Sequence, residues 1–209
     1  MFSFQQICDA LFGASVRNIP VSRDSVYLTF DDGPDPTTTP LVLDLLAQKN
    51  AKATFFVIGT QAKAYPDILK RIVREGHAVG DHSWDHRYYR FFLGKRSLKK
   101  WITNSQRNLF ELTGTTPVGF RSPAGVRTPE LHAALDTLNI PLIHWNQRCY
   151  DTLFTFNPRK ARKLLFRIHE GDILLLHDHK QAKQLTPFLQ GLECLLDGII
   201  NRNLKFSKL

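Results

Sequence analysis

Short apolar segments alternate with helix-like segments along the whole chain, and this alternation constrains the fold more than any other feature. The apolar segments have the length of buried strands, and they cover residues 25–31, 53–58, 77–80, 140–145 and 173–176. Such runs, joined through helices, are typical of parallel strands that are covered on both faces. The sequence therefore predicts an α/β domain, either a barrel or an open doubly wound sheet, and periodicity does not choose between them.

Local signals mark where the helices begin. Thr38 or Thr39 is expected to cap a helix that has Pro40 at its first position. Thr128 and Asn157 each precede a proline in the same way. Apolar residues then recur about every 3.6 positions. These patterns predict helices starting near residues 40, 97, 129 and 158, a continuous helix over 62–74, and a last helix ending near residue 200.

Length and composition bound the class of protein. The chain has 209 residues, 43% of them hydrophobic, which fits one globular domain. No transmembrane segment is expected, because the longest apolar run, 173–176, is far shorter than the roughly 18 residues that a membrane-spanning helix needs. The N-terminus lacks the basic and apolar regions of a secretory signal, so a cytoplasmic protein is expected. Cys8, Cys149 and Cys194 lack CxxC spacing and are interpreted as reduced and buried.

The net charge of +9 raises the question of an anionic partner. Basic residues gather in one segment at helical spacing, as Arg159, Lys160, Arg162, Lys163 and Arg167. The simplest interpretation is a solvated helix face, and the alternative is contact with an anionic glycan, a lipid headgroup or nucleic acid. No nucleic-acid-binding module is recognisable, so no nucleic-acid partner is expected.

Polar side chains follow the predicted strands, where α/β folds place their sites. Asp31 and Asp32 end the first strand, and two adjacent carboxylates there are costly unless they are paired or bind a metal. Because neighbouring side chains of an extended chain point apart, one carboxylate can face a metal and the other a substrate. His82 and His86 lie four residues apart and can converge on one ion from a helical turn. With one carboxylate they form a three-ligand site with open positions.

Two further candidates follow later segments. Arg121 carries a planar guanidinium that suits holding a carboxylate in place, although a surface cation is the alternative. His177 lies at the end of the buried strand 173–176, beside Asp178. It is a candidate general acid, and a structural histidine is the alternative.

Taken together, these motifs resemble those of the polysaccharide deacetylase family (carbohydrate esterase family four, the NodB-homology domain). The five family motifs occur in the same order here, at residues 29–34, 82–86, 121–125, at Trp145 with Asp151, and at residues 175–178. The resemblance covers about Ile19 to the C-terminus. We therefore expect an N-terminal extension over residues 1–18 and a catalytic domain over residues 19–209.

The resemblance implies a fold and an activity. The fold would be a distorted, incomplete (β/α) barrel of about seven parallel strands. The activity would be metal-dependent removal of N-acetyl groups from a glycan that contains N-acetylglucosamine. The metal would be held by Asp32, His82 and His86, and this donor set suits zinc, with cobalt or nickel as substitutes.

The resemblance also assigns roles in the reaction. Asp31 would be the catalytic base and Arg121 would orient it. His177 would be the general acid, and Asp151 would support this charged network. The backbone N–H of Ala124 would bind the oxyanion of the reacting carbonyl group.

Two positions depart from the family pattern. Ala124 stands where the family usually has an aromatic residue, so the backbone donor is kept but a wall of the groove is lost. Thr152 stands where the family has a tryptophan that walls the acetyl pocket opposite Leu175. The acyl and acceptor specificity of this chain are therefore left open.

Three alternatives remain beside N-deacetylation. The same metal chemistry could remove a formyl or acyl group from a lipid-linked sugar, and the basic segment would then bind its anionic headgroup. A non-catalytic glycan-binding protein is disfavoured, because base, ligands and acid are all present, and a nucleic-acid binder is weaker still. The sequence does not determine the oligomeric state. Five histidines match no catalytic position and are interpreted as structural or surface residues: His77, His132, His144, His169 and His179.

Overall fold

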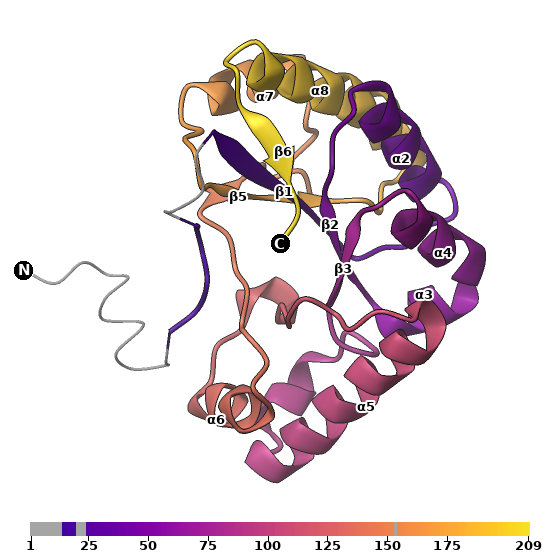
Figure 1. Cartoon of the computed structure of the whole chain (residues 1–209), viewed down its shortest axis with the longest axis vertical. Coiled ribbons are helices and arrows are strands. Elements are labelled where there is room, and N and C mark those ends of the chain that lie inside the picture. Colours follow the sequence, from indigo (N-terminus) through magenta and orange to yellow (C-terminus); the bar gives the residue numbers. More distant parts are fainter. Residues whose placement is uncertain (1–13, 20–23, 153) are drawn as a thin grey trace, which may run out of the picture.

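The computed structural model of the chain describes residues 14–19, 24–152 and 154–209. Most of the expected N-terminal extension, residues 1–13, lies outside the described residues, and so does Cys8. The described part forms one six-stranded sheet whose strand pairings are all parallel. Helices surround these strands (Figure 1), as the alternating apolar segments predict.

The sheet is built around β1, whose seven residues are all buried. Its strand order is β3-β2-β1-β5-β4, and β6 pairs with the first half of β1. The strands are β1 (Ser25–Asp31), β2 (Thr54–Val57), β3 (Ala78–Asp81), β4 (Gln147–Arg148), β5 (Ile173–His177) and β6 (Lys205–Ser207). The register aligns Asp31 at the end of β1 with His177 at the end of β5.

Isolated bridges extend this sheet beyond β3 and favour the barrel over an open sheet. Phe120 bridges to Asp81 at the end of β3 and also to Leu142, and both bridges are parallel. The chain that contains Leu142 continues into β4, which pairs with β5. The two outer strands are thus linked through residues 120 and 142 in a barrel-like arrangement. It has six strands within the described residues, where the resemblance implied about seven.

The predicted strand over residues 140–145 is wrong. Here the chain makes only the bridges of Leu142 and Ile143. The physical reason is the guanidinium of Arg121, whose Nε donates to the carbonyl oxygen of Ile143 at 3.1 Å. Its NH2 group donates to the carbonyl oxygen of His144 at 2.9 Å. These two carbonyl groups therefore bond to a side chain, and the regular strand begins only at β4.

The helices lie outside the strands in Figure 1, with α8 and α7 at one end and α5 and α6 at the other. They are α2 (Thr38–Gln48), α3 (Gly59–Ala64), α4 (Pro66–Arg74), α5 (Lys95–Thr113), α6 (Pro129–Leu138), α7 (Pro158–Leu165) and α8 (Ala182–Ile200). Two short 3-10 helices, η1 (Tyr88–Phe92) and η2 (Pro123–Gly125), lie in loops. Among the described helices, none combines the length and the apolar character that crossing a bilayer requires.

Proline explains where the helix predictions succeed and fail. The caps at Thr128 and Asn157 are confirmed, because each side chain accepts an N–H bond three residues on. The expected helix over 62–74 is two helices, since Pro66 has no N–H to continue α3 and instead begins α4. The predicted cap of α2 is also wrong, because Pro40 is its third residue. The carboxylate of Asp35 accepts the N–H groups of Thr37 and Thr38 at its start instead.

The core has two main parts that hold the strand ends in place. The larger packs β1, β2 and β5 against α2, α4 and α8, with Phe30, Phe55 and Leu174 fully or almost fully buried. The smaller lies under α5 and α6 around Phe120. Cys149 and Cys194 are both free thiols, as predicted. Cys149 is buried, as expected, whereas Cys194 is only partly buried.

Candidate active site

The carboxyl ends of β1, β3 and β5 meet at one edge of the sheet, because these strands are parallel. Three of the four predicted motifs follow these strands, and they line one cavity of about 220 Å³. Its walls are Asp31, Asp32, His82, His86, Tyr88, Ala124, Trp145, Arg148, Thr152, Leu175 and His177. Of the nine predicted site residues, seven thus line the cavity, while Arg121 and Asp151 lie behind it.

Asp32, His82 and His86 come together as a possible metal site. One ligand atom from each residue lies within 4.8 Å of the others. The Oδ1 atom of Asp32 is 3.5 Å from Nε2 of His82 and 3.4 Å from Nε2 of His86. Two imidazoles and one carboxylate, with the rest of the cavity open beside them, are the donor set of catalytic zinc sites.

The tautomer of His82 follows from its second hydrogen bond. Its Nδ1 lies 2.8 Å from the carbonyl oxygen of Arg121, which can only accept. The proton is therefore on Nδ1, and the lone pair of Nε2 faces Asp32. Such a bond orients metal-binding histidines and raises their basicity. The residues present thus fit a divalent metal.

The backbone around the three candidate ligands is strained rather than helical. Asp32, Ser83 and His86 have φ values of 78°, 70° and 53°, a region that costs non-glycine residues energy. The helical turn expected for the histidine pair is wrong: β3 ends at Asp81 and a loop follows. In this loop the hydroxyl of Ser83 accepts the N–H of His86 at 3.1 Å, and this bond turns the second histidine back towards Asp32.

Arg121 is fully buried behind Asp31, which excludes the alternative of a surface cation. Its NH1 group donates to Oδ1 of Asp31 at 2.8 Å and to Oγ1 of Thr29 at 2.6 Å. The guanidinium also packs on the ring of Phe56, 3.9 Å from its centroid. With the two carbonyl groups described above, every nitrogen of Arg121 is engaged. The orientation of the Asp31 carboxylate is therefore fixed by the core.

His177 is held by a buried carboxylate on the other side of the cavity. Its ring Nδ1 lies 2.9 Å from Oδ1 of Asp151, and its backbone N–H donates to Oδ2 at 2.8 Å. Lys180 donates to the same Oδ2 at 2.8 Å. Burial acts to lower the pKa of His177, but the hydrogen bond and charge of Asp151 outweigh it and raise the pKa above its ordinary value. The raised pKa favours the protonated form of His177, which is the form that can act as a general acid at the cavity.

Asp178, the neighbour of His177, has a structural position instead. It is fully buried, and Oγ1 of Thr39 donates to its Oδ2 at 2.5 Å. Burial raises its pKa to about 7. A side chain at Gly33 would overlap this carboxyl group. The glycine after the two aspartates thus lets Asp178 join the end of β5 to the start of α2.

The two positions that depart from the family pattern, Ala124 and Thr152, both belong to the wall of the cavity. Leu175 also lines the cavity, and Thr152 is solvent-exposed. Ala124 has a φ of 52°, so its backbone lies in the left-handed region. Trp145 forms part of the wall, whereas Phe154 lines a separate hollow.

Sequence reasoning missed four neighbours of the site: Thr29, Tyr88, Arg148 and Lys180. Lys180 lies three residues after His177, and a cation so close to a candidate acid was the available signal. The other three left no signal of comparable strength. None of the five unassigned histidines, all within the described residues, lines the cavity. His77 accepts the N–H of Ala53, and burial lowers its pKa to about 4, so it is structural.

Comparison with known proteins agrees with this geometry. The family model described as polysaccharide deacetylase matches residues 18–143. The peptidoglycan-N-acetylglucosamine deacetylase PgdA of Listeria monocytogenes is 37% identical over 206 residues, which are 92% of this chain and 43% of that protein. The chitooligosaccharide deacetylase of Azorhizobium caulinodans is 32% identical over 170 residues, 81% of this chain and 80% of that protein.

A solved structure shows the same fold. The Bc1960 peptidoglycan N-acetylglucosamine deacetylase superposes with a TM-score of 0.84 at 26% identity, over 100% of this chain and 95% of that one. The present chain spans less than half of the Listeria relative, so the comparison concerns one part of that protein. The family match covers more than half of the chain, including the loops that carry Asp31, Asp32, His82, His86 and Arg121. The chain belongs to the polysaccharide deacetylase family.

Proposed function

We propose that the chain hydrolyses the N-acetyl group of an N-acetylglucosamine-containing glycan. One observation carries this proposal: a buried Asp–Arg pair, a possible metal site and a His–Asp pair surround a single cavity. Relatives that are named as peptidoglycan and chitooligosaccharide deacetylases support it. A non-catalytic glycan binder would not need all three groups at one place.

The metal in this proposal is held by Asp32, His82 and His86. Their one oxygen and two nitrogens favour zinc, with cobalt or nickel as substitutes. When bound, the ion supplies Lewis-acid polarisation of the acetyl carbonyl group and lowers the pKa of water. The chain contributes to this chemistry through the bond between His82 and the Arg121 carbonyl oxygen, which presets the ligand geometry.

The proton transfers fall to the two paired residues. Asp31 accepts a proton from the attacking water while the water oxygen bonds to the acetyl carbon. Arg121 holds the Asp31 carboxylate in place for this step. The backbone N–H of Ala124 stabilises the negative charge that develops on the carbonyl oxygen. His177 donates its proton to the amide nitrogen as the C–N bond breaks. The products are acetate and a free amine on the sugar.

Acetate release from chitooligosaccharides and peptidoglycan tests the proposal. Zinc-loaded protein is expected to release acetate from at least one of them, and protein treated with a chelator is expected to lose this activity until zinc is restored. Removal of a formyl or longer acyl group from a sugar substrate, with no acetate release, would reassign the reaction. Glycan binding without any release would establish the non-catalytic alternative.

A further inference from the structure

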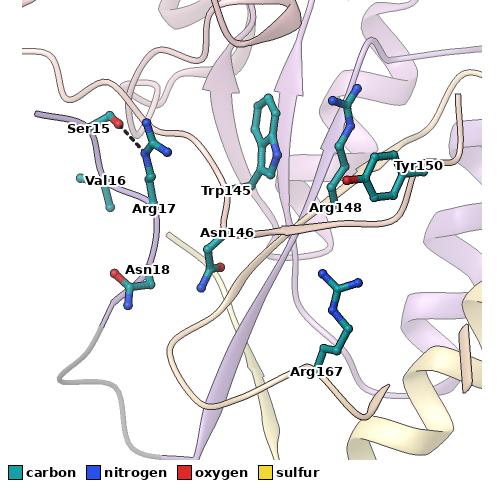
Figure 2. Close-up of a pocket in the computed structure, with 9 residues that line it drawn as sticks. All are labelled: Ser15, Val16, Arg17, Asn18, Trp145, Asn146, Arg148, Tyr150 and Arg167. Carbon is teal, nitrogen blue, oxygen red and sulfur yellow. Dashed lines mark hydrogen bonds between the residues drawn. The ribbon is translucent and has the colours of Figure 1, made fainter. Parts of the chain in front are cut away.

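A second hollow lies directly beside the catalytic cavity. It has a volume of about 750 Å³ (Figure 2) and is lined by Ser15, Val16, Arg17, Asn18, Trp145, Asn146, Arg148, Tyr150 and Arg167. Trp145 and Arg148 also line the catalytic cavity. Figure 2 shows both side chains extending in the same direction from the chain segment around β4. The two hollows therefore share part of one wall, and we call the second hollow the arginine groove.

The lining of the arginine groove is one-sidedly basic. Arg17, Arg148 and Arg167 come from three separate parts of the chain, and no aspartate or glutamate is among the described residues that line the groove. Guanidinium groups bind carboxylates and phosphates through two parallel hydrogen bonds. Concave sites lined by one sign of charge also concentrate ions of the opposite sign.

Arg148 stands out among the three arginines. Its Nε is buried and has no hydrogen-bond partner among the described residues. A buried donor without a partner costs about 1–3 kcal/mol. Because Nε itself is closed off, a ligand would contact the other guanidinium nitrogens of this partly buried side chain. The guanidinium lies 5.8 Å from the ring centroid of Trp145 and 5.4 Å from that of Tyr150. Arg148 is thus held at the junction of the two cavities, between two aromatic side chains that can pack on sugar rings.

The rest of the groove is fixed to the sheet. Val16 donates its N–H to the carbonyl oxygen of Leu142 at 2.9 Å, which anchors the segment that carries Arg17. The side-chain amide of Gln147, on β4, donates to the carbonyl oxygen of Arg167 at 3.1 Å. Arg167 itself is exposed, at the end of the basic segment. The groove is therefore a built concavity whose charged side chains are set around one edge of β4.

We propose that the arginine groove binds an oxyanion, a carboxylate or a phosphate, carried by the glycan next to the sugar that is deacetylated. The inference rests on the proposed function for the placement of that sugar. It makes acidic glycans the preferred substrate class. It also gives part of the net charge of +9 a specific role. The carboxylate would come from an acidic substituent on the neighbouring sugar, and the phosphate from a substituent at the reducing end.

Three matched ligands distinguish these sources. They are N,N′-diacetylchitobiose, the same disaccharide with a lactyl ether carboxylate on the second sugar, and the same disaccharide with a 1-phosphate. Titration calorimetry with zinc-loaded Asp31→Asn protein measures binding without turnover. At least one charged ligand is expected to bind about tenfold more tightly than the neutral one at low salt, and this advantage should shrink at about 1 M salt. The charged ligand that shows the advantage identifies the source.

Two arginine variants separate the groove from the general charge of the protein. Arg167→Ala is expected to reduce the tenfold advantage to about threefold, since one of three cations is lost. Arg159→Ala removes the same charge from an exposed position of α7 outside the groove, and should keep the full advantage. Equal binding of all three ligands would overturn the proposal, as would an equal loss in both variants.

A second measurement covers the case in which Asp31→Asn does not fold. The ratio of KM values of the wild-type protein for the neutral and charged disaccharides should then show the same tenfold preference, and a ratio near one would overturn the inference. The binding measurement tests the groove, and the acetate-release measurement tests the proposed function, so the two proposals can be refuted independently. A preference for charged ligands without acetate release would contradict the proposed function alone, whereas acetate release without that preference would contradict the groove alone.

Discussion

The ring and the backbone of His177 both donate to the carboxylate of Asp151, at 2.9 and 2.8 Å. Because a carboxylate only accepts, the proton on this side of the ring is on Nδ1, and Nε2 is left to face the cavity that His177 lines. The two bonds fix the side chain and the end of β5 together. They also connect the proposed general acid to a charge that lies outside the cavity, so the pKa of His177 can be altered without changing a residue that lines the cavity.

We predict that Asp151→Asn moves the alkaline limb of the pH–rate profile to lower pH. The general acid must be protonated, and it is protonated below its pKa. Asp151 raises that pKa, so its charge extends activity to higher pH, and removing the charge reverses this shift. Rates measured across the alkaline range test this, with exposed Asp136→Asn as the control. An unchanged limb in Asp151→Asn would show that His177 is not the titrating acid.

The metal site predicts a loss of zinc content in histidine variants. His82→Ala and His86→Ala should each bind zinc more weakly, and the double variant should retain no stoichiometric zinc, because only Asp32 remains of the three ligands. Elemental analysis after dialysis provides the measurement. His179→Ala is the matched control, since that histidine is exposed and pairs with Asp35 outside the cavity. Full zinc in the double variant would refute the ligand assignment.

Asp31 should affect turnover while leaving the metal in place. In Asp31→Asn the carboxylate that accepts the proton is lost, and we expect a decrease in kcat of about 10²–10⁴-fold, which is typical for general acid–base groups. Zinc content is expected to stay close to one per chain, since Asp31 is not among the three ligands. Acetate release and elemental analysis on the same sample test both parts. Near-native turnover would mean that another group is the base.

Arg121 links the site to stability. Arg121→Met leaves the buried Asp31 carboxylate without its ion partner, and removing one member of a buried pair costs about 3–5 kcal/mol. The free energy of unfolding in urea should fall by this amount. Lys49→Met removes a cation from the partly exposed surface pair with Asp197, and should cost less than about 1 kcal/mol. Equal effects in the two variants would contradict the role of Arg121 in the core.

Thr152 controls the size of the acyl pocket in our interpretation. Threonine leaves a wider pocket opposite Leu175, so we expect weak selectivity for acetyl over propionyl groups. Thr152→Trp should sharpen the selectivity, by an amount within the about 1–3 kcal/mol that one methylene contributes. Rates on matched N-acetyl and N-propionyl glycans test this, with exposed Thr155→Trp as the control outside the cavity. Strong acetyl preference in the wild type, unchanged in Thr152→Trp, would assign the wall to another residue such as Trp145.

The sequence alone determined the elements whose signals are local. Strand β1 was predicted with its observed bounds, because its short, largely apolar run of residues is visible in the sequence itself, and all seven residues are buried. The caps of α6 and α7 were predicted because a side chain bonds to a backbone N–H three residues away. Asp31, Asp32, His82, His86 and His177 were also predicted from local order, since motifs placed after parallel strands must meet at one edge of the sheet, whereas Tyr88 and Arg148 in the same cavity were not.

Only the tertiary structure decided how these residues are held. The strand expected at 140–145 does not form, because Arg121, more than 20 residues earlier in the chain, takes up the carbonyl groups of Ile143 and His144. The pairing of His177 with Asp151 and Lys180, and the sharing of Trp145 and Arg148 by two cavities, likewise join separate segments. Such contacts depend on how the barrel brings together segments that are far apart in the sequence. Neither hydrophobic periodicity nor residue spacing along the chain reveals which distant segments will be in contact.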